Sequence, residues 1–105
     1  MAVTCDVASS SNIWRITLTI TVSGGVGEET FNQTGRILQA AIIPPNGATY
    51  DFEIGDEDGY GIGGEPNLSG KVTLGIDKIC FKVNTIYFTN ATDGDYKVRL
   101  LISPR

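Results

Sequence analysis

The sequence predicts an all-β domain, an antiparallel two-sheet sandwich that is jelly-roll or Greek-key like and has seven to eight strands. Three observations support this fold class. Apolar and polar residues alternate over most of the chain, no stretch of useful length has a helical period, and 13 glycines and four prolines interrupt the pattern. Short alternating strands separated by turns about every 8–12 residues are typical of sandwiches and small barrels.

The clearest strand covers residues 13–22. Its apolar side chains, from Trp14 to Val22, stand at every second position, and Arg15 and three threonines stand between them. One face of this strand is therefore expected to lie in the core, with Trp14 buried alongside the last strand. A glycine-rich turn at residues 23–27 ends it.

The remaining elements follow in order along the chain. A short polar strand is predicted at an edge, then a strand that is apolar on both faces and so central, which two prolines end. A glycine-rich loop is predicted over residues 55–69. Whether the pieces 80–83 and 86–89 form one bent strand or a hairpin stays open. The predicted strands after the first cover residues 29–34, 36–43, 50–54, 71–76, 80–83 with 86–89, and 96–102.

Residues 1–12 are polar and lack periodicity, so they are predicted to be a flexible N-terminal arm attached to a single sandwich domain over residues 13–105. The arm lacks the basic start and the apolar stretch of a secretion signal. Synthesis in the cytoplasm, or a trimmed chain, is therefore expected. Cys5 and Cys80 are expected to be free thiols in a reducing compartment, although a disulfide between them stays open.

Charge argues against two kinds of partner. The chain has 12 acidic and 8 basic residues, with a formal net charge of −4, and the bases are scattered along the sequence. Phosphate neutralisation needs clustered Lys and Arg, so neither nucleic acid nor an anionic membrane surface is expected as a partner. No apolar run approaches the roughly 20 residues of a membrane span.

The sequence offers little for catalysis. It contains no histidine, which removes the usual base of Ser and Cys nucleophiles, so no enzyme activity, catalytic residue or cofactor is predicted. Carboxylates cluster at residues 56–58 among glycines, which predicts a solvated loop. Calcium at Asp56 and Asp58 is the alternative, but the spacing does not match an EF-hand, so no metal is predicted.

The glycine-rich loop is also a candidate for partner contact, because binding residues often lie on loops. Tyr60 is the aromatic residue expected to be most exposed, and Ile62 follows it two positions later. Both are candidate contacts with a protein or a glycan. A single exposed tyrosine is a thin basis for sugar binding.

The order of turns and core positions resembles small all-β proteins encoded among the virion structural genes of tailed bacteriophages, over about residues 13–102. This resemblance is structural and brings no catalytic residues. The segments that carry it are Trp14-Arg15-Ile16-Thr17, Gly35-Arg36-Ile37, Ile42-Ile43-Pro44-Pro45, Thr49-Tyr50-Asp51-Phe52-Glu53-Ile54, Asp56-Glu57-Asp58-Gly59, Phe88-Thr89-Asn90-Ala91 and Gly94-Asp95-Tyr96-Lys97-Val98-Arg99-Leu100.

Proteins of this size and class include capsid cement, or decoration, proteins. The resemblance implies a non-enzymatic structural protein on the capsid surface of the virion, whose partners are the major capsid protein and, in a homotrimer, itself. It also implies that the N-terminal arm grips the capsid, with Thr4, Asp6, Ser10 and Asn12 as candidate contacts. A carbohydrate- or host-surface-binding module is the alternative function. Head or tail location, and trimer or dimer, stay open.

Overall fold

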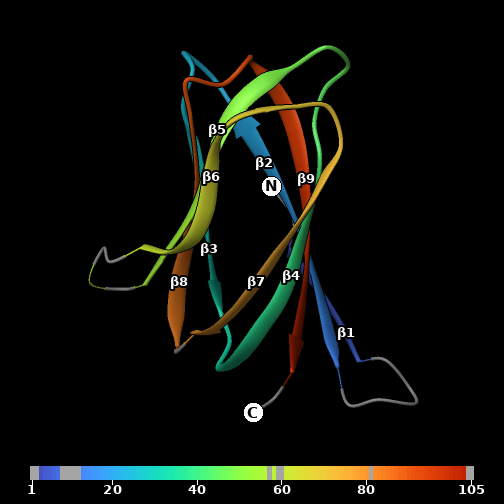
Figure 1. Ribbon diagram of the computed structural model, residues 1–105, viewed down its shortest axis with the longest axis vertical. Helices are drawn as coiled ribbons and strands as arrows, with labels where there is room; N and C mark the ends of the chain where they lie inside the picture. The colour runs from blue at the N-terminus through green and yellow to red at the C-terminus, as the bar shows by residue number, and fades with distance from the viewer. Residues whose placement is uncertain (1–2, 8–12, 57, 59–60, 81, 104–105) are drawn as a thin grey trace.

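The structure is a sandwich of two antiparallel β-sheets (Figure 1). The computed structural model describes residues 3–7, 13–56, 58, 61–80 and 82–103, and within these it contains nine strands. The predicted all-β, two-sheet antiparallel sandwich is confirmed. Among the described residues, no helix is long and apolar enough to cross a membrane.

The first sheet has five strands and the second has four. In the five-stranded sheet the spatial order is β1 (Val3–Val7), β2 (Trp14–Val22), β9 (Gly94–Ser103), β4 (Gly35–Ile43) and β7 (Val72–Cys80). In the four-stranded sheet it is β3 (Gly27–Asn32), β8 (Val83–Thr89), β5 (Thr49–Asp56) and β6 (Gly61–Ser69). Consecutive strands repeatedly cross between the sheets, so most pairings join distant parts of the chain.

The alternation of the sequence determines which side chains enter the core. On β2 the residues from Ile16 to Val22 at every second position are buried, and their polar neighbours face outward. The last strand shows the same pattern, from Tyr96 to Ile102. On the facing sheet Phe52, Ile54 and other buried apolar residues complete one continuous core.

Four aromatic rings lie at the centre of this core, with neighbouring ring centroids 4.5–5.7 Å apart. They are Tyr50, Phe52, Phe88 and Tyr96. Both tyrosine hydroxyls reach backbone acceptors: Tyr50 donates to the Gly70 carbonyl and Tyr96 to the Thr92 carbonyl, each at 2.7 Å. Each buried hydroxyl is thus satisfied and ties the core to a turn.

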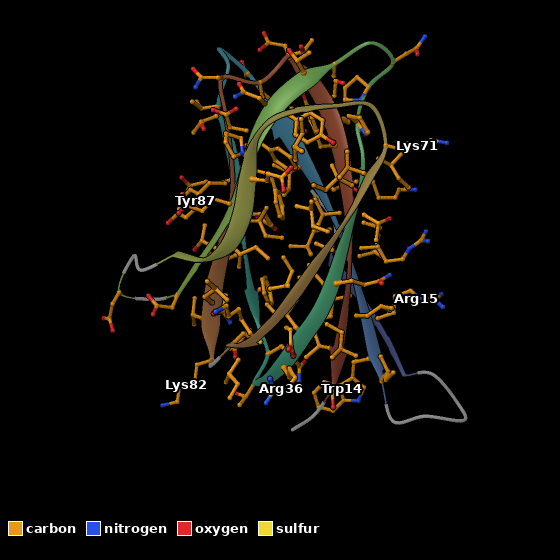
Figure 2. All side chains as sticks on the ribbon, viewed as in Figure 1. Trp14, Arg15, Arg36, Lys71, Lys82 and Tyr87 are labelled. Carbon is orange, nitrogen blue, oxygen red and sulfur yellow. The ribbon has the colours of Figure 1, made fainter. Side chains whose placement is uncertain are left out.

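The expectation that Trp14 is buried is wrong, because this residue is only half-buried. It is the first residue of β2, and Figure 2 places it at the end of the sandwich that holds Arg36. Burial on β2 begins two residues later, at Ile16. Alternation predicted the correct face for Trp14 but not its position at the end of the sandwich.

The predicted loop over residues 55–69 is also wrong for most of its length, because residues 61–69 form β6. This strand pairs with β5 through two register shifts. Its glycines provide no side chains that could alternate, so the pattern that predicts a strand is absent although the backbone pairs. Residues 80–83 and 86–89 form neither of the predicted arrangements, one bent strand or a hairpin. Instead, β7 ends at Cys80 in the five-stranded sheet, and β8 begins at Val83 in the four-stranded sheet.

Part of the predicted arm is a strand instead of an unstructured segment. Val3–Val7 pairs with β2, with Val3 opposite Leu18 and Val7 opposite Trp14. Together with β6, this strand brings the number of described strands to nine, one more than the upper limit of seven to eight. Residues 1–2 and 8–12 of the predicted arm lie outside the described residues.

Candidate functional site

A pocket of about 480 Å³ lies on the four-stranded sheet, where β5, β6 and the end of β8 meet. It is lined by residues 61–66 of β6, by residues 51–53 of β5 and by Thr89. On β5 the buried residues Tyr50 and Phe52 alternate with Asp51 and Glu53, so both carboxylates point outward.

Glycines keep this pocket open. A Cβ atom at Gly61 would lie 2.8 Å from Oε2 of Glu53, so the carboxylate occupies the space that a side chain would need. At Gly64, where φ is +152°, a Cβ would lie only 2.3 Å from the Phe52 carbonyl oxygen. Glycine at these positions lets β6 approach β5 closely and leaves its backbone accessible.

The Asp51 carboxylate accepts two hydrogen bonds at the edge of the pocket. The Asn67 backbone N–H donates to its Oδ1 at 2.8 Å, and the Asn90 Nδ2 donates to its Oδ2 at 2.9 Å. Asn67 and Asn90 have positive φ values of 59° and 47°, a conformation that asparagine tolerates better than most residues. These two hydrogen bonds hold the pKa of Asp51 below its ordinary value, so the group stays an anion.

The other two carboxylates of the pocket are available to a ligand. Glu53 and Glu65 are exposed, and among the described residues no Lys or Arg lies within 4.0 Å of either carboxylate. Tyr87 stands directly across from Glu53 on β8, and Glu28 of β3 flanks Tyr87 on its other side. The site can therefore accept hydrogen bonds from hydroxyls or hold a cationic group.

The fold also separates charge between the two sheets. The four strands of the smaller sheet carry six acids and no base: Glu28, Glu29, Asp51, Glu53, Asp56 and Glu65. The five strands of the larger sheet carry five bases, namely Arg15, Arg36, Lys78, Lys97 and Arg99, against three acids, namely Asp6, Asp77 and Asp95. Bases that are scattered along the sequence thus gather on one sheet. Figure 2 shows Arg15 and Lys71 projecting from the side opposite Tyr87.

A second polar cluster lies inside the sandwich, around the Gln33 carbonyl. The Cys80 thiol donates to this oxygen at 3.2 Å, and the Asn84 side-chain amide lies 3.4 Å from it. Cys80 is free and fully buried, and burial raises the pKa of its thiol. A buried, protonated thiol is a poor nucleophile.

The calcium candidates do not meet in a ligand cluster. Asp58 donates its backbone N–H to Oδ1 of Asp56 at 2.9 Å, which is a turn contact within the loop. Within the described part of the chain, no three Cys, Asp or Glu residues come together as potential metal ligands. The prediction that no metal is bound is not tested by this and stays a prediction.

The predicted partner contacts are placed only in part. Ile62 is half-buried, lines the pocket and packs against the core. Thr4 and Asp6 lie on β1, opposite Thr17 and Arg15. Tyr60, Ser10 and Asn12 lie outside the described residues.

Apart from Ile62, sequence reasoning missed the residues that line the pocket, although a signal for two of them exists. Asp51 and Glu53 alternate with buried aromatics, which already places two carboxylates on an outer face. What the sequence does not reveal is that a glycine-rich strand pairs beside them.

Comparison with known proteins does not assign a family. No family model matches the sequence, and no curated protein matches it either.

Proposed function

We propose that this protein is a non-enzymatic structural protein of a bacteriophage virion, a capsid cement or decoration protein that stabilises the head. It is made in the host cytoplasm and binds the major capsid protein on the capsid surface as a homotrimer. The observation that carries the proposal is the position of β1 at the margin of the five-stranded sheet (Figure 1). The similarity of turns and core positions to small virion proteins supports it.

Strand β1 offers an edge for a partner chain. It pairs with β2 on one side, and no other described strand pairs with its outer edge. An edge strand presents unpaired N–H and C=O groups, and an extended segment of another protein can add to it as a further strand. Such an N-terminal edge suits a protein that clamps neighbouring subunits.

A cement function also suits the chemistry of the chain. Capsid cement proteins need many identical contacts on a lattice, whose individually weak affinities add by avidity. The sandwich supplies a rigid body with outward polar faces, and the pocket supplies carboxylates that bind without covalent chemistry.

Removal of the edge tests this proposal. A chain truncated at Ser11 should keep its melting transition and β-sheet circular dichroism, because it keeps every core residue of the described part of the chain, from Ile16 to Ile102. It should lose most of its binding to particles that lack the protein, measured by co-sedimentation. The matched control is Val7→Ala, which keeps every backbone group of the edge and changes none of the candidate contacts. Full binding by the folded, truncated chain would contradict the proposal that the edge of β1 binds the capsid.

Carbohydrate or host-surface binding is the second candidate, and the position of Tyr87 favours it. This ring is half-buried on the outer face, directly across from the Glu53 carboxylate and beside the pocket. Aromatic rings stack on sugars while carboxylates accept hydrogen bonds from their hydroxyls. A glycan array read with wild type, Tyr87→Ala and Tyr87→Phe separates the functions. Binding that is lost in the alanine variant and kept in the phenylalanine variant, without particle binding, would favour the module.

A further inference from the structure

We infer that the two outer faces of the sandwich bind each other between copies of this chain, with Arg99 of one copy entering the acidic pocket of the next. This inference rests on the self-association in the proposed function and does not depend on the capsid partner. It assigns the surfaces through which the copies meet.

The receiving surface is acidic and lacks an internal counter-charge. Glu53 and Glu65 line the pocket and are exposed, Asp51 is held as an anion beside them, and the strands of this sheet contain no Lys or Arg. At about 480 Å³ the pocket is in the size range of small-molecule sites, so it has room for a long basic side chain. A guanidinium matches a carboxylate with two parallel hydrogen bonds.

The donating surface is the outer face of β2 and β9. Arg99 is exposed and has Thr17 of β2 and Ala41 of β4 as its cross-strand partners. Both partners are small, so the long Arg99 side chain extends beyond its neighbours. Lys97 follows two positions away on the same face. No carboxylate of a described side chain lies within 4.0 Å of either cation.

Complementary charge is what selects a second copy as the occupant. The strands of one sheet carry six acids and no base, and those of the other carry five bases against three acids, so the smaller sheet of one copy attracts the larger sheet of another. Such a contact is heterologous, because one copy uses different surfaces for its two neighbours. The rotation between neighbours decides whether the contacts close into a ring or extend further.

Two charge-reversal variants test the contact in the absence of capsids. Glu53→Lys destroys the acidic surface and keeps the basic one, whereas Arg99→Glu does the reverse. Each alone should self-associate at least about tenfold more weakly than wild type, because like charges then face each other across the contact. Mixed together, unlike copies again present opposite charges to each other at both surfaces, so self-association should return in sedimentation velocity. Asp58→Lys is the matched control, since it changes the net charge equally at an exposed loop residue outside the strands of both sheets and outside the pocket lining.

The outcomes separate this inference from the proposed function. Wild type should be larger than a monomer at low ionic strength and should dissociate as salt screens the contact. Wild type that is monomeric at every salt concentration overturns the inference together with self-association, while particle binding, measured separately, can still hold. Oligomers that survive both reversals, or variants that stay monomeric when mixed, overturn the assigned surfaces alone.

Discussion

Phe88→Ala is expected to be among the most damaging single substitutions in this chain, and to exceed Trp14→Ala although tryptophan is the larger residue. Phe88 is fully buried, and its ring centroid lies 4.5 Å from that of Tyr96, 5.5 Å from Phe52 and 5.7 Å from Tyr50. Its removal leaves a cavity at the centre of the aromatic cluster. Rings on both sheets hold that cavity open.

The magnitude follows from burial. Truncation of a buried phenylalanine to alanine costs about 3–5 kcal/mol, and the lost ring pairs place this site near the upper end. The whole domain is expected to be stable by about 5–15 kcal/mol, so the variant should unfold at least about 15 °C earlier. Trp14 is half-buried, so Trp14→Ala should cost only about 1–2 kcal/mol.

Urea unfolding followed by far-UV circular dichroism measures both losses without relying on tryptophan fluorescence. Phe88→Leu is the control, because it keeps most of the volume and should cost about 1–1.5 kcal/mol. A loss for Trp14→Ala equal to or greater than that for Phe88→Ala would refute the argument that the core is centred on the four rings.

Four further predictions concern single groups. Burial, reinforced by Tyr96, raises the pKa of Tyr50 from 10.0 to about 12, so the stability that its neutral form contributes is complete below pH 10 and is lost as the pH rises toward 12. Tyr50→Phe should cost about 1 kcal/mol at neutral pH by losing the bond to Gly70, and its melting temperature should fall less steeply in alkali. The stability contributed by Asp51 has the opposite pH dependence, because its pKa is lowered from 3.8. Asp51→Asn should therefore lower the melting temperature at pH 7. The difference from wild type should shrink as the pH falls below 3.8. Gly64→Ala should destabilise by more than about 1 kcal/mol because its Cβ meets the Phe52 carbonyl, whereas Gly75→Ala, which has open space, should be nearly neutral in the same melts. Chelation or added calcium should leave the melting temperature unchanged, and a reproducible calcium-dependent rise would revive the site at Asp56 and Asp58.

Side-chain alternation predicts the sandwich because each sheet has one face in the core. On β2, β5 and β9 the buried positions follow the period of two in the sequence. The long strand at 36–43 is central, as its two apolar faces predict, with β9 on one side and β7 on the other. Strands of this kind can be recognised in the sequence because the side chains of their two faces differ in polarity.

The elements that sequence reasoning missed lack that contrast. Strand β6 is built from Gly61, Gly63, Gly64 and polar residues, so its pairing depends on backbone groups that leave no side-chain pattern. Strand β1 pairs on one side only among the described strands, and it lies in a segment that reads as an arm. Trp14 fits the alternation, but periodicity cannot show where the sandwich ends.

The candidate site depends on long-range pairing, which no local pattern reveals. Asp51 meets Asn67 and Asn90, which are 16 and 39 positions away. The separation of charge is similar, since Arg15 and Arg99 come to lie in one sheet only because β2 pairs with β9. Strand order, and not composition, makes the smaller sheet acidic and gives the larger sheet an excess of bases.

Thermal release of packaged DNA from the virion tests the central claim most directly. Particles assembled without this protein should form normally but release their DNA at a lower temperature, and addition of the purified protein should restore wild-type release. Particles that are equally heat-stable with and without it, or purified virions that do not contain it, would contradict the cement function.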